Sequence, residues 1–367
     1  MISVAIIGLG AVTRNIHLPA YAQLKDRVSV VAGCDPDQEA RASIQKSRQL
    51  PQVFDSPEEM IEKTRPDVVA ICTPPSLHHE QTLTALNYGC HVFCEKPMAE
   101  SLWQADEMIS AAEKAKRLVV INNQFPYMKI HQAAKQRIGR PEFGRLLFLQ
   151  AWQTFRPTDL TEAGWRGQMQ RRLCFEFGVH VFELIRFFFD DTPTRIFAHM
   201  PNPRPEIKSD LINILSMEFA DGRAACVILN RISKARERYL DMRLDGELAS
   251  IHTSIGGEVR FEAGIHTKEK RPFLHFHFAQ GGKAVLQDGN KSKVIARDGI
   301  DPFASATAHH FRTFIGAIEN GRVPTGSAAD NRNTLAMVLA AYDSAESGRA
   351  IELSRYDKEA CEGVAVG

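Results

Sequence analysis

The chain has 367 residues, a length that favours two domains, each large enough to bury a core of its own. Its formal net charge is +1 and the charges are spread along the sequence, so neither nucleic acid nor an anionic membrane is indicated as a partner. No apolar run approaches the roughly 18 residues that span a bilayer, and we expect neither a membrane span nor a signal peptide. Seven cysteines without a framework spacing fit free thiols, so we expect a globular, cytoplasmic protein.

The first 35 residues carry the pattern of a βαβ dinucleotide-binding unit. An apolar run at residues 4–7 leads into a glycine-spaced turn, and a second apolar run at residues 28–32 ends close to Asp35. Gly8 lets the chain turn sharply off the first strand, and Gly10 lets the backbone approach a pyrophosphate at the positive end of the next helix. Asp35 is placed to accept hydrogen bonds from a ribose and to repel a 2′-phosphate, which favours NAD over NADP.

The third glycine of the motif is replaced by Thr13, so the prediction depends on the flanking strands and the acid as well as on the turn. A plain strand–turn–helix without a cofactor is the alternative at this point.

Helices and strands continue to alternate over the first third of the chain. Capping and amphipathic patterns predict helices at residues 56–63, 76–87 and 101–116. Continuous apolar runs predict strands covered on both faces at residues 68–72, 90–94 and 118–121. The alternation predicts a parallel, doubly wound sheet, and we place a Rossmann domain at residues 1–123.

The pattern changes near Phe125, where alternating apolar and polar residues become common. They predict half-buried strands at residues 146–154, 195–199, 212–219, 224–229, 239–244 and 249–253. Helices are predicted at residues 131–138, 177–189, 305–319 and 328–347. We therefore expect a second, α+β domain with a mostly antiparallel sheet at residues 124–353, and a frayed tail at residues 354–367.

Two further clusters carry groups suited to proton and hydride transfer. Lys96 follows a predicted strand, and the carboxyl ends of parallel strands form the crevice in which ligands bind. Its ammonium group there would hold a substrate hydroxyl and stabilise the oxyanion that develops as a carbonyl forms. His180 lies on a predicted helix, one turn after Glu176 and one turn before Glu183, and imidazole is a suitable base near neutral pH. A solvated loop lysine and a core histidine paired with a carboxylate are the alternatives for each cluster taken alone.

Four motifs, in order and spacing, resemble the glucose–fructose oxidoreductase/inositol dehydrogenase (Gfo/Idh/MocA) family over about residues 1–350. They are Gly8-Leu9-Gly10, Thr73-Pro74-Pro75-Ser76-Leu77-His78-His79, Glu95-Lys96-Pro97 and Gly178-Val179-His180. The resemblance implies an N-terminal Rossmann domain and a C-terminal domain with an open antiparallel sheet that serves substrate binding and oligomerisation. It also implies an enzyme that oxidises or reduces sugars, polyols or inositols with NAD(P).

The same resemblance assigns roles to individual residues. The catalytic positions are Lys96 and His180. The cofactor positions are Gly8, Gly10, Ala11, Val12, Asp35, Thr73, Pro74, His78, Glu95, Lys96 and Asn122. We expect substrate contacts from Lys96, Tyr127, Trp165, Arg166, Glu176 and His180.

Three departures from the family pattern concern the substrate. Glu176 and Glu183 stand where the family usually has aspartates, and Asn123-Gln124 replaces an Arg-Arg pair. Residues 171–175 replace a glycine-rich run with bulkier, partly cationic residues, which would suit an anionic substrate.

The combined prediction is an NAD(H)-dependent oxidoreductase that acts on a hydroxyl or carbonyl of a sugar, polyol, inositol or sugar acid. His180 would accept the hydroxyl proton while Lys96 favours the alkoxide, in a dry cleft between the domains. Two alternatives stay open. One is an NAD-dependent glycosidase or lyase that oxidises its substrate transiently, and the other is a non-enzymatic regulator that senses a nucleotide or sugar.

The remaining clusters predict a subunit interface and no metal site. Residues 273–278 place His275 and His277 on one strand face and phenylalanines on the other, which we interpret as a face covered by a second subunit. A homodimer or homotetramer through the C-terminal sheet is therefore expected. On residues 90–94, alternation sends His91 to the face opposite Cys90 and Cys94, which argues against a zinc site.

Overall fold

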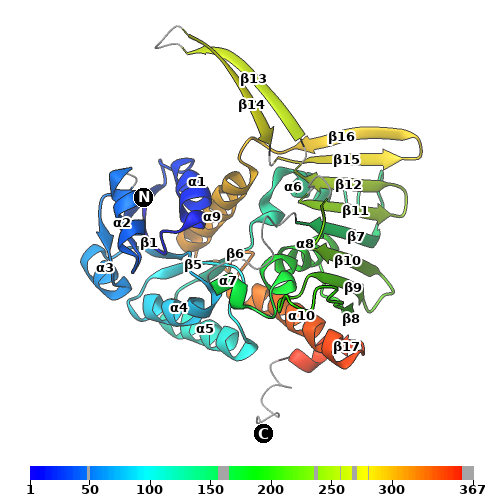
Figure 1. Cartoon of the computed structure of the whole chain (residues 1–367), viewed down its shortest axis with the longest axis horizontal. Helices are drawn as coiled ribbons and strands as arrows, with labels where there is room; N and C mark the ends of the chain where they lie inside the picture. Colours follow the sequence, from blue (N-terminus) through cyan, green and yellow to red (C-terminus); the bar gives the residue numbers. More distant parts are fainter. Residues whose placement is uncertain are drawn as a thin grey trace. The chain divides into compact units, whose positions relative to one another are not determined.

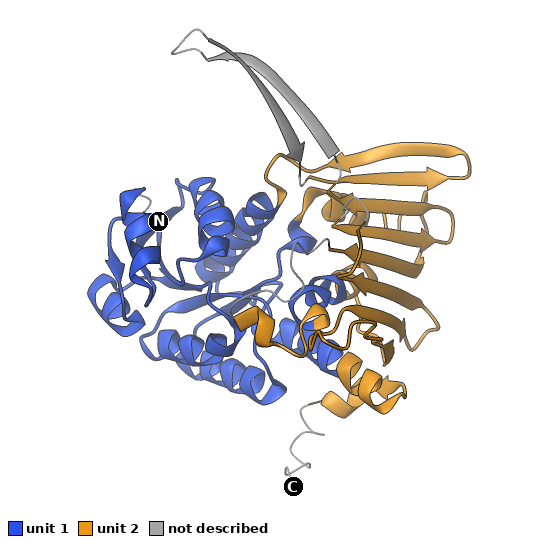
Figure 2. Cartoon of the chain, viewed as in Figure 1, with its two compact units in different colours: residues 1–127, 175–183, 303–339 blue, residues 128–174, 184–302, 340–367 orange. Residues whose placement is uncertain are grey.

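The computed structural model describes residues 1–47, 50–155, 165–234, 239–256, 258–266, 271–279 and 281–357, with the backbone alone for the two ranges between 258 and 279. The chain forms two compact units (Figure 2). Unit 1 comprises residues 1–127, 175–183 and 303–339, and unit 2 comprises residues 128–174, 184–302 and 340–367. Both units are discontinuous in sequence, whereas the domains expected from the sequence are contiguous, and those domain boundaries stay a prediction. Among the described residues, no helix is long and apolar enough to cross a membrane.

Unit 1 is built on a six-stranded parallel sheet (Figure 1). In spatial order the strands are β3 (Val53–Phe54), β2 (Val28–Cys34), β1 (Ile2–Ile7), β4 (Val68–Ile71), β5 (His91–Glu95) and β6 (Val119–Asn122). Every neighbouring pair in this sheet is parallel. The order reverses between β1 and β4, the point at which doubly wound sheets bind their ligands. The predicted doubly wound sheet is confirmed.

Local sequence signals place the helices of this sheet. The helical segments are the π-helix η1 (Thr13–His17), α1 (Leu18–Ala22), α2 (Gln38–Lys46), α3 (Pro57–Thr64), η2 (Pro75–Leu77), α4 (His78–Asn87), α5 (Leu102–Ala115) and η3 (Phe125–Tyr127). Asp37, Ser56 and Ser101 precede α2, α3 and α5, and each side chain accepts a hydrogen bond from a backbone N–H of the first turn. The helix starts therefore follow from single polar residues.

A helix from late in the sequence completes the core of this sheet. Helix α9 (Pro302–Asn320) contributes Phe311 and Phe314, and both pack against Phe93 of β5 with ring centres 4.9 and 5.8 Å away. All three side chains are fully buried. The hydrophobic effect thus joins residues more than 200 positions apart into one core.

Unit 2 is built on a nine-stranded, mostly antiparallel sheet. In spatial order the strands are β16 (Lys291–Arg297), β15 (Lys283–Asp288), β12 (Ser250–Ile255), β11 (Leu240–Gly246), β7 (Leu146–Thr154), β10 (Ala224–Asn230), β9 (Ile212–Glu218), β8 (Arg195–His199) and β17 (Ile351–Glu352). In this order only the β7–β10 pair is parallel. The predicted mostly antiparallel sheet is confirmed, although β15, β16 and β17 were not predicted.

Several segments lie outside this sheet or are divided between the units. The other elements are α6 (Lys129–Lys135), α7 (Trp165–Gln168), η4 (Leu173–Gly178), α8 (Val179–Phe189), α10 (Ala328–Ser347), η5 (Leu353–Tyr356) and the antiparallel pair of β13 (Glu258–His266) and β14 (Arg271–Ala279). The side chains of residues 273–278 lie outside the described ones, so the interface interpretation of that stretch stays a prediction. Within the expected tail, residues 354–356 belong to η5, and residues 358–367 lie outside the described ranges.

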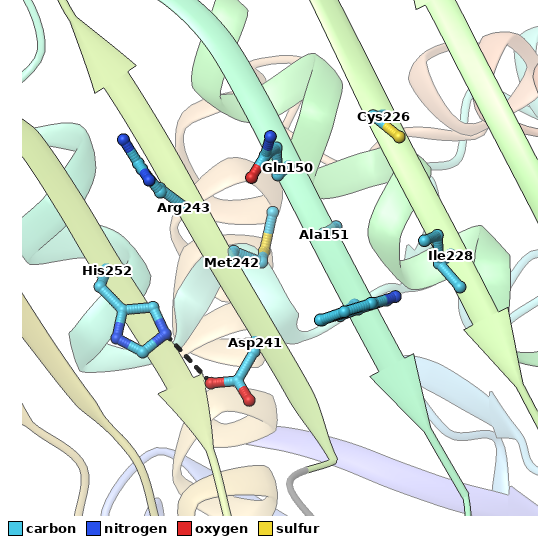
Figure 3. Close-up of a pocket in the computed structure, with 9 residues that line it drawn as sticks. Gln150, Ala151, Cys226, Ile228, Asp241, Met242, Arg243 and His252 are labelled. Atoms are coloured by element: carbon cyan, nitrogen blue, oxygen red, sulfur yellow. Dashed lines mark hydrogen bonds and ion pairs between the residues drawn. The ribbon is translucent and has the colours of Figure 1, made fainter. Parts of the chain in front are cut away.

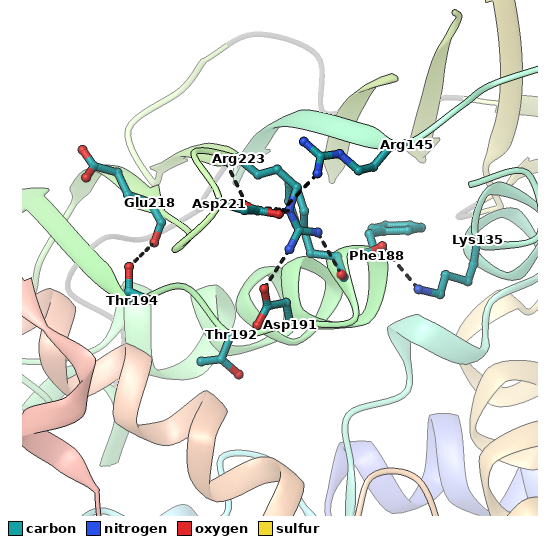
Figure 4. A network of polar contacts seen from close by, with 10 residues as sticks. Lys135, Arg145, Phe188, Asp191, Thr192, Thr194, Glu218, Asp221 and Arg223 are labelled. Carbon is teal, nitrogen blue, oxygen red and sulfur yellow. Dashed lines mark hydrogen bonds and ion pairs between the residues drawn. The ribbon is translucent and has the colours of Figure 1, made fainter. Parts of the chain in front are cut away.

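Arg223 ties the turn between β9 and β10 to the end of α8 in unit 2 (Figure 4). Its guanidinium donates to Asp191 Oδ2 at 2.7 Å, to Asp221 Oδ1 at 2.8 Å and to the carbonyl oxygen of Phe189 at 3.1 Å. The stem is largely buried, and the guanidinium carbon lies 5.2 Å from the ring centre of Phe219. Planar donors in a fixed fork suit this multiple contact, so one side chain holds the turn and the end of α8 together.

Candidate functional site

The carboxyl ends of the parallel strands bring the predicted cofactor residues to one edge of the sheet. Gly8, Asp35 and Thr73 follow β1, β2 and β4, while Lys96 follows β5 and Asn122 ends β6. Because all these strands run in the same direction, their ends form a common rim. Residues from five separate stretches therefore meet in unit 1.

The glycine turn has the geometry that a dinucleotide phosphate needs. Gly8 has a φ of +90°, and a Cβ there would lie 2.7 Å from the carbonyl oxygen of Cys72, so only glycine fits. A Cβ at Gly10, in contrast, would meet no atom within 4 Å, which leaves its backbone open to approach. Thr13 donates from Oγ1 to the carbonyl oxygen of Gly8 at 2.5 Å. The residue in place of the third glycine thus closes the turn through a hydrogen bond.

Asp35 holds this turn to the end of β2. Its Oδ2 accepts from the backbone N–H of Leu9 at 2.8 Å, and its Oδ1 accepts from that of Asp37 at 2.9 Å. A carboxylate has about four acceptor positions, so two remain for a ribose. Sequence reasoning missed Arg41, which donates from Nη1 to the carbonyl oxygens of Asp35 and Pro36 at 2.7 and 2.9 Å. The sequence signal that could have indicated Arg41 is an arginine near the start of the helix that follows Asp35.

Glu95 and Asn122, two of the predicted cofactor residues, belong to a buried polar network. Glu95 Oε1 lies 2.8 Å from His17 Nε2 and accepts from Asn122 Nδ2 at 2.7 Å. His17 Nδ1 lies 3.1 Å from the hydroxyl oxygen of Tyr21, and Asn122 Nδ2 also contacts Thr307 Oγ1 at 3.3 Å. His17 was missed from the sequence because its partner is 78 positions away.

The network carries a charged pair. Burial opposes the charge on His17, but attraction to Cys72 and Tyr21 and the hydrogen bond to Glu95 outweigh it, so the pKa of His17 is raised well above its usual value. Burial likewise opposes ionisation of Glu95, yet the contacts with His17 lower the pKa of that carboxyl. The raised pKa of His17 and the lowered pKa of Glu95 describe an imidazolium paired with a carboxylate. Glu95 directly precedes Lys96 in the sequence.

His78 joins the loop after β4 to the loop after β5. Its Nδ1 lies 2.8 Å from the carbonyl oxygen of Pro97, and its Nε2 lies 2.9 Å from that of Thr73. The ring is fully buried, and burial lowers its pKa. A neutral ring has one N–H, so it donates to one of these two carbonyl oxygens at a time. His78 thus lies between the loops that carry Thr73, Pro74 and Lys96, and it bonds to one of them.

The two predicted catalytic residues, Lys96 and His180, both lie in unit 1. Lys96 Nζ donates to the carbonyl oxygen of Glu176 at 2.7 Å and lies 5.9 Å from the ring centre of Phe177. The acceptor is one turn before His180 on the continuous helical segment η4–α8. Burial, and then the charge of Lys96, lowers the pKa of His180 well below its usual value. The structure thus presents an ammonium group and a neutral imidazole within each other's electrostatic range.

The side chains around His180 hold it firmly. Its Nδ1 lies 2.7 Å from Asn123 Oδ1, and Asn123 Nδ2 donates to the carbonyl oxygen of Val179 at 3.3 Å. The ring of Phe125 stacks on the imidazole with 4.1 Å between centres and 6° between planes. Asn123, which sequence reasoning treated only as a departure from the family pattern, is thus a direct partner of His180.

The predicted substrate residues divide between the two units. Glu176 is buried in unit 1, and Tyr127 is buried there too, its hydroxyl donating to the carbonyl oxygen of Thr325 at 3.1 Å. Trp165 and Arg166 lie on α7 in unit 2, with the guanidinium carbon 4.3 Å from the indole centre. Arg171, one of the two arginines in the stretch 171–175 that we expected to suit an anionic substrate, pairs with Glu346 of the same unit at 2.6 Å.

Comparisons with known proteins point to one family. A model described as "Oxidoreductase family, NAD-binding Rossmann fold" matches residues 2–123, and the GFO/IDH/MocA C-terminal domain model matches residues 131–252. D-apiose dehydrogenase of Paraburkholderia graminis is 25% identical over 97% of this chain and 91% of its own length. 1,5-anhydro-D-fructose reductase of Ensifer adhaerens is 26% identical over 81% of this chain and 83% of its own length.

A solved structure shows the same fold. It is an oxidoreductase from Agrobacterium radiobacter in complex with NAD+, L-tartaric acid and magnesium, with a TM-score of 0.80 at 18% identity. The match covers 96% of this chain and 98% of that one.

The His17–Glu95 pair predicts a pH-dependent stability. The raised pKa of His17 contributes stability that is complete below the unfolded value of about 6.5 and is lost as the pH rises through the folded value. The lowered pKa of Glu95 contributes stability that is present above about pH 4.3 and is lost as the pH falls. We therefore expect the contribution of the pair to the free energy of unfolding to be greatest between about pH 5 and 6.

Urea unfolding of the wild type and His17→Gln across the neutral and alkaline range measures this. The wild type should lose stability above about pH 6.5 by more than the variant does. His79→Gln, which removes a more exposed histidine–carboxylate pair in the same unit, should keep the wild-type slope. Parallel curves for the wild type and His17→Gln would contradict the assignment.

Proposed function

The chain belongs to the Gfo/Idh/MocA family of NAD-binding oxidoreductases, and we propose that it transfers a hydride between NAD(H) and a hydroxyl or carbonyl carbon of a sugar, polyol, inositol or sugar acid. One observation supports this proposal above the others. The ammonium group of Lys96, at the rim of the parallel sheet, is bonded to the helical segment that carries the buried, neutral His180. A positive donor and a neutral base are the two groups that alcohol oxidation requires.

We propose that the two residues divide the chemistry as follows in the oxidation direction. Bound NAD supplies the hydride acceptor. Nε2 of His180 takes the hydroxyl proton, while Lys96 Nζ donates a hydrogen bond to the same oxygen and stabilises its negative charge. The charge of Lys96 also disfavours protonation of His180, which keeps the base ready before the substrate enters.

The cofactor residues have separate tasks in this proposal. The backbone of Gly8, Gly10, Ala11 and Val12 would hold the pyrophosphate, because the space beside Gly10 is open and the turn leads into a helix N-terminus. The free acceptor positions of Asp35 would bind the ribose. Thr73, Pro74, His78, Glu95 and Asn122 would shape the nicotinamide side, with Glu95 and Asn122 acting through the strand ends that they brace.

The substrate class rests on the relatives. Two of them are named for D-apiose and 1,5-anhydro-D-fructose, both compounds of the sugar type. We propose substrate contacts from Tyr127, Trp165, Arg166 and Glu176 in addition to Lys96 and His180. Because the relatives are named dehydrogenases and reductases, an enzyme is favoured over a regulator.

A screen of sugars, inositols and sugar acids with NAD and NADP tests the substrate class. Net formation of NADH separates a dehydrogenase from a glycosidase that regenerates NAD.

Removing either proposed catalytic group should strongly lower the rate of turnover. We expect Lys96→Ala and His180→Ala each to lower kcat by about 10²–10⁴-fold, the usual contribution of a positioned acid or base. NAD binding, measured by calorimetry, should persist in both variants. Lys63→Ala, which alters an exposed lysine in the same unit, serves as the control and should keep full activity. Wild-type rates in both alanine variants would refute the mechanism.

Asp35 should set the preference for NAD over NADP. In Asp35→Ser the repulsion of a 2′-phosphate is lost, and the ratio of kcat/KM for NADP to that for NAD should rise about tenfold or more. Asp37→Ser makes the same change two residues later and keeps a helix-capping side chain, so its ratio should equal that of the wild type. An unchanged ratio in Asp35→Ser would refute the role of the acid.

We propose a homo-oligomer formed through the face of the unit 2 sheet that carries Trp152. Strand register places Trp152, Ile228 and Ile214 side by side on one face, and Trp152 is 59% exposed. Figure 3 shows a hollow on this face, where Arg243 and Gln150 lie beside the His252–Asp241 pair. An apolar row with charges of both signs beside it is complementary to a second copy of itself, as a twofold interface requires.

Light scattering tests the oligomer. We expect the wild type to have the mass of a dimer or tetramer, and Trp152→Glu to shift it toward a single chain because a charge would be buried in the apolar row. Trp103→Glu, at another exposed tryptophan, should leave the mass unchanged. A wild type that is a monomer at micromolar concentration would remove the proposal.

We also propose a cytoplasmic location. Seven cysteines without a framework spacing support a reducing compartment, in which thiols stay free. Fractionation of the source cells with an antibody to the chain tests this. Recovery in a secreted fraction would contradict it.

A further inference from the structure

We infer that Asn123 is a positioning residue that selects the tautomer of His180 and so makes Nε2 the atom that accepts the substrate proton; the inference rests on the proposed oxidoreductase function. Asparagine does not titrate. Asn123 follows β6, whereas Lys96 follows β5. Its role follows from hydrogen-bond logic within unit 1.

The orientation of the Asn123 amide is set by its second partner. Nδ2 lies 3.3 Å from the carbonyl oxygen of Val179, which can only accept a hydrogen bond. The NH₂ group must therefore face Val179, and Oδ1 must face His180. A reversed amide would oppose two oxygens at Val179 and lose that bond.

The amide orientation in turn determines the imidazole. Asn123 Oδ1 can only accept, and it lies 2.7 Å from Nδ1 of His180, so Nδ1 carries the proton. In a neutral ring Nε2 then holds the lone pair. Because the hydrogen bond at one ring nitrogen sets which nitrogen is protonated, this bond decides which nitrogen acts as the base.

Packing holds the ring in that orientation. Phe125 stacks on the imidazole with 4.1 Å between ring centres, and Asn123, Phe125 and His180 are all almost fully buried. A flip of the ring would need Asn123 to give up its bond in an almost fully buried site.

The same strand pair positions both working groups. β5 and β6 are parallel, with Glu95 opposite Asn122, so the next residues, Lys96 and Asn123, leave the two strands at the same level. The same sheet edge thus positions the ammonium group of Lys96 and, through Asn123, the proposed base His180.

The charges around His180 explain why a neutral acceptor suits this position. The charge of Lys96, at the end of β5, opposes protonation of His180. Glu176 and Glu183 lie on the same helical segment as His180. Asn123 and Phe125, from the segment after β6, are uncharged. An amide oxygen selects the tautomer without attracting a second proton. A carboxylate at residue 123 would select the same tautomer and also favour the imidazolium.

Nitrogen NMR of the ¹⁵N-histidine-labelled full chain tests the tautomer without a substrate. We expect His180, assigned by its loss in His180→Gln, to show a protonated Nδ1 and an unprotonated Nε2 near neutral pH. Asn123→Leu removes the acceptor at similar volume, and a large fraction of His180 should then carry the proton on Nε2. Asn331→Leu, an equally buried asparagine in the same unit, is the matched control and should keep the wild-type signals.

The pH profile of kcat supplies the second readout. Asn123→Leu should lower kcat by about 10²-fold or more, since a misplaced lone pair removes most of the base catalysis. Asn123→Asp should recover much of the rate and move the acidic limb of the profile to higher pH, because its carboxylate raises the pKa of His180. A merely structural role would not produce recovery together with a shifted limb.

The outcomes separate the inference from the proposed function. A wild-type His180 with its proton on Nε2, or an unchanged tautomer in Asn123→Leu, would overturn the role of Asn123. If the tautomer follows Asn123 but His180→Ala retains turnover, the positioning stands and the proposed function fails.

Discussion

The parallel pairing of β5 with β6 is the constraint on which the candidate site depends. The register sets Glu95 opposite Asn122, and the side chains of these two residues are hydrogen bonded at 2.7 Å. Lys96 and Asn123 follow directly, so the positions of the ammonium group and of the partner of His180 come from one pair of strands. A one-residue slip would send every side chain on the strand to the opposite face.

Near this strand pair, the pKa values of two buried histidines, His17 and His180, are shifted in opposite directions. Interactions with Cys72, with Tyr21 and with its partner Glu95 outweigh burial and raise the pKa of His17. Burial, and then the nearby ammonium group of Lys96, lower the pKa of His180. The pKa values of two buried histidines in one unit therefore shift in opposite directions because their surroundings differ, and a neutral imidazole is the form that can serve as a base.

Much of the fold was predictable because its signals are local. Apolar runs of four or five residues predicted strands of the parallel sheet, alternation predicted strands of the antiparallel sheet, and the capping residue Ser56 predicted a helix start. The short strands β15 and β16 were missed, since their sequences hold many charged residues and weak alternation. The contribution of α9 to the core of the N-terminal sheet was also missed, because burial against Phe93 has no local signature.

The sequence by itself determined the glycine turn and the doubly wound order of elements, and it indicated Lys96 and His180 as candidates for the proposed catalysis, since each depends on neighbouring residues and on a motif at fixed spacing. Only the tertiary structure decided what those groups contact. His17 meets Glu95 across 78 positions and His180 meets Asn123 across 57, and neither separation has a helical or strand period. The protonation of a buried histidine is set by the partner that folding brings to it, and a linear sequence does not contain that distance.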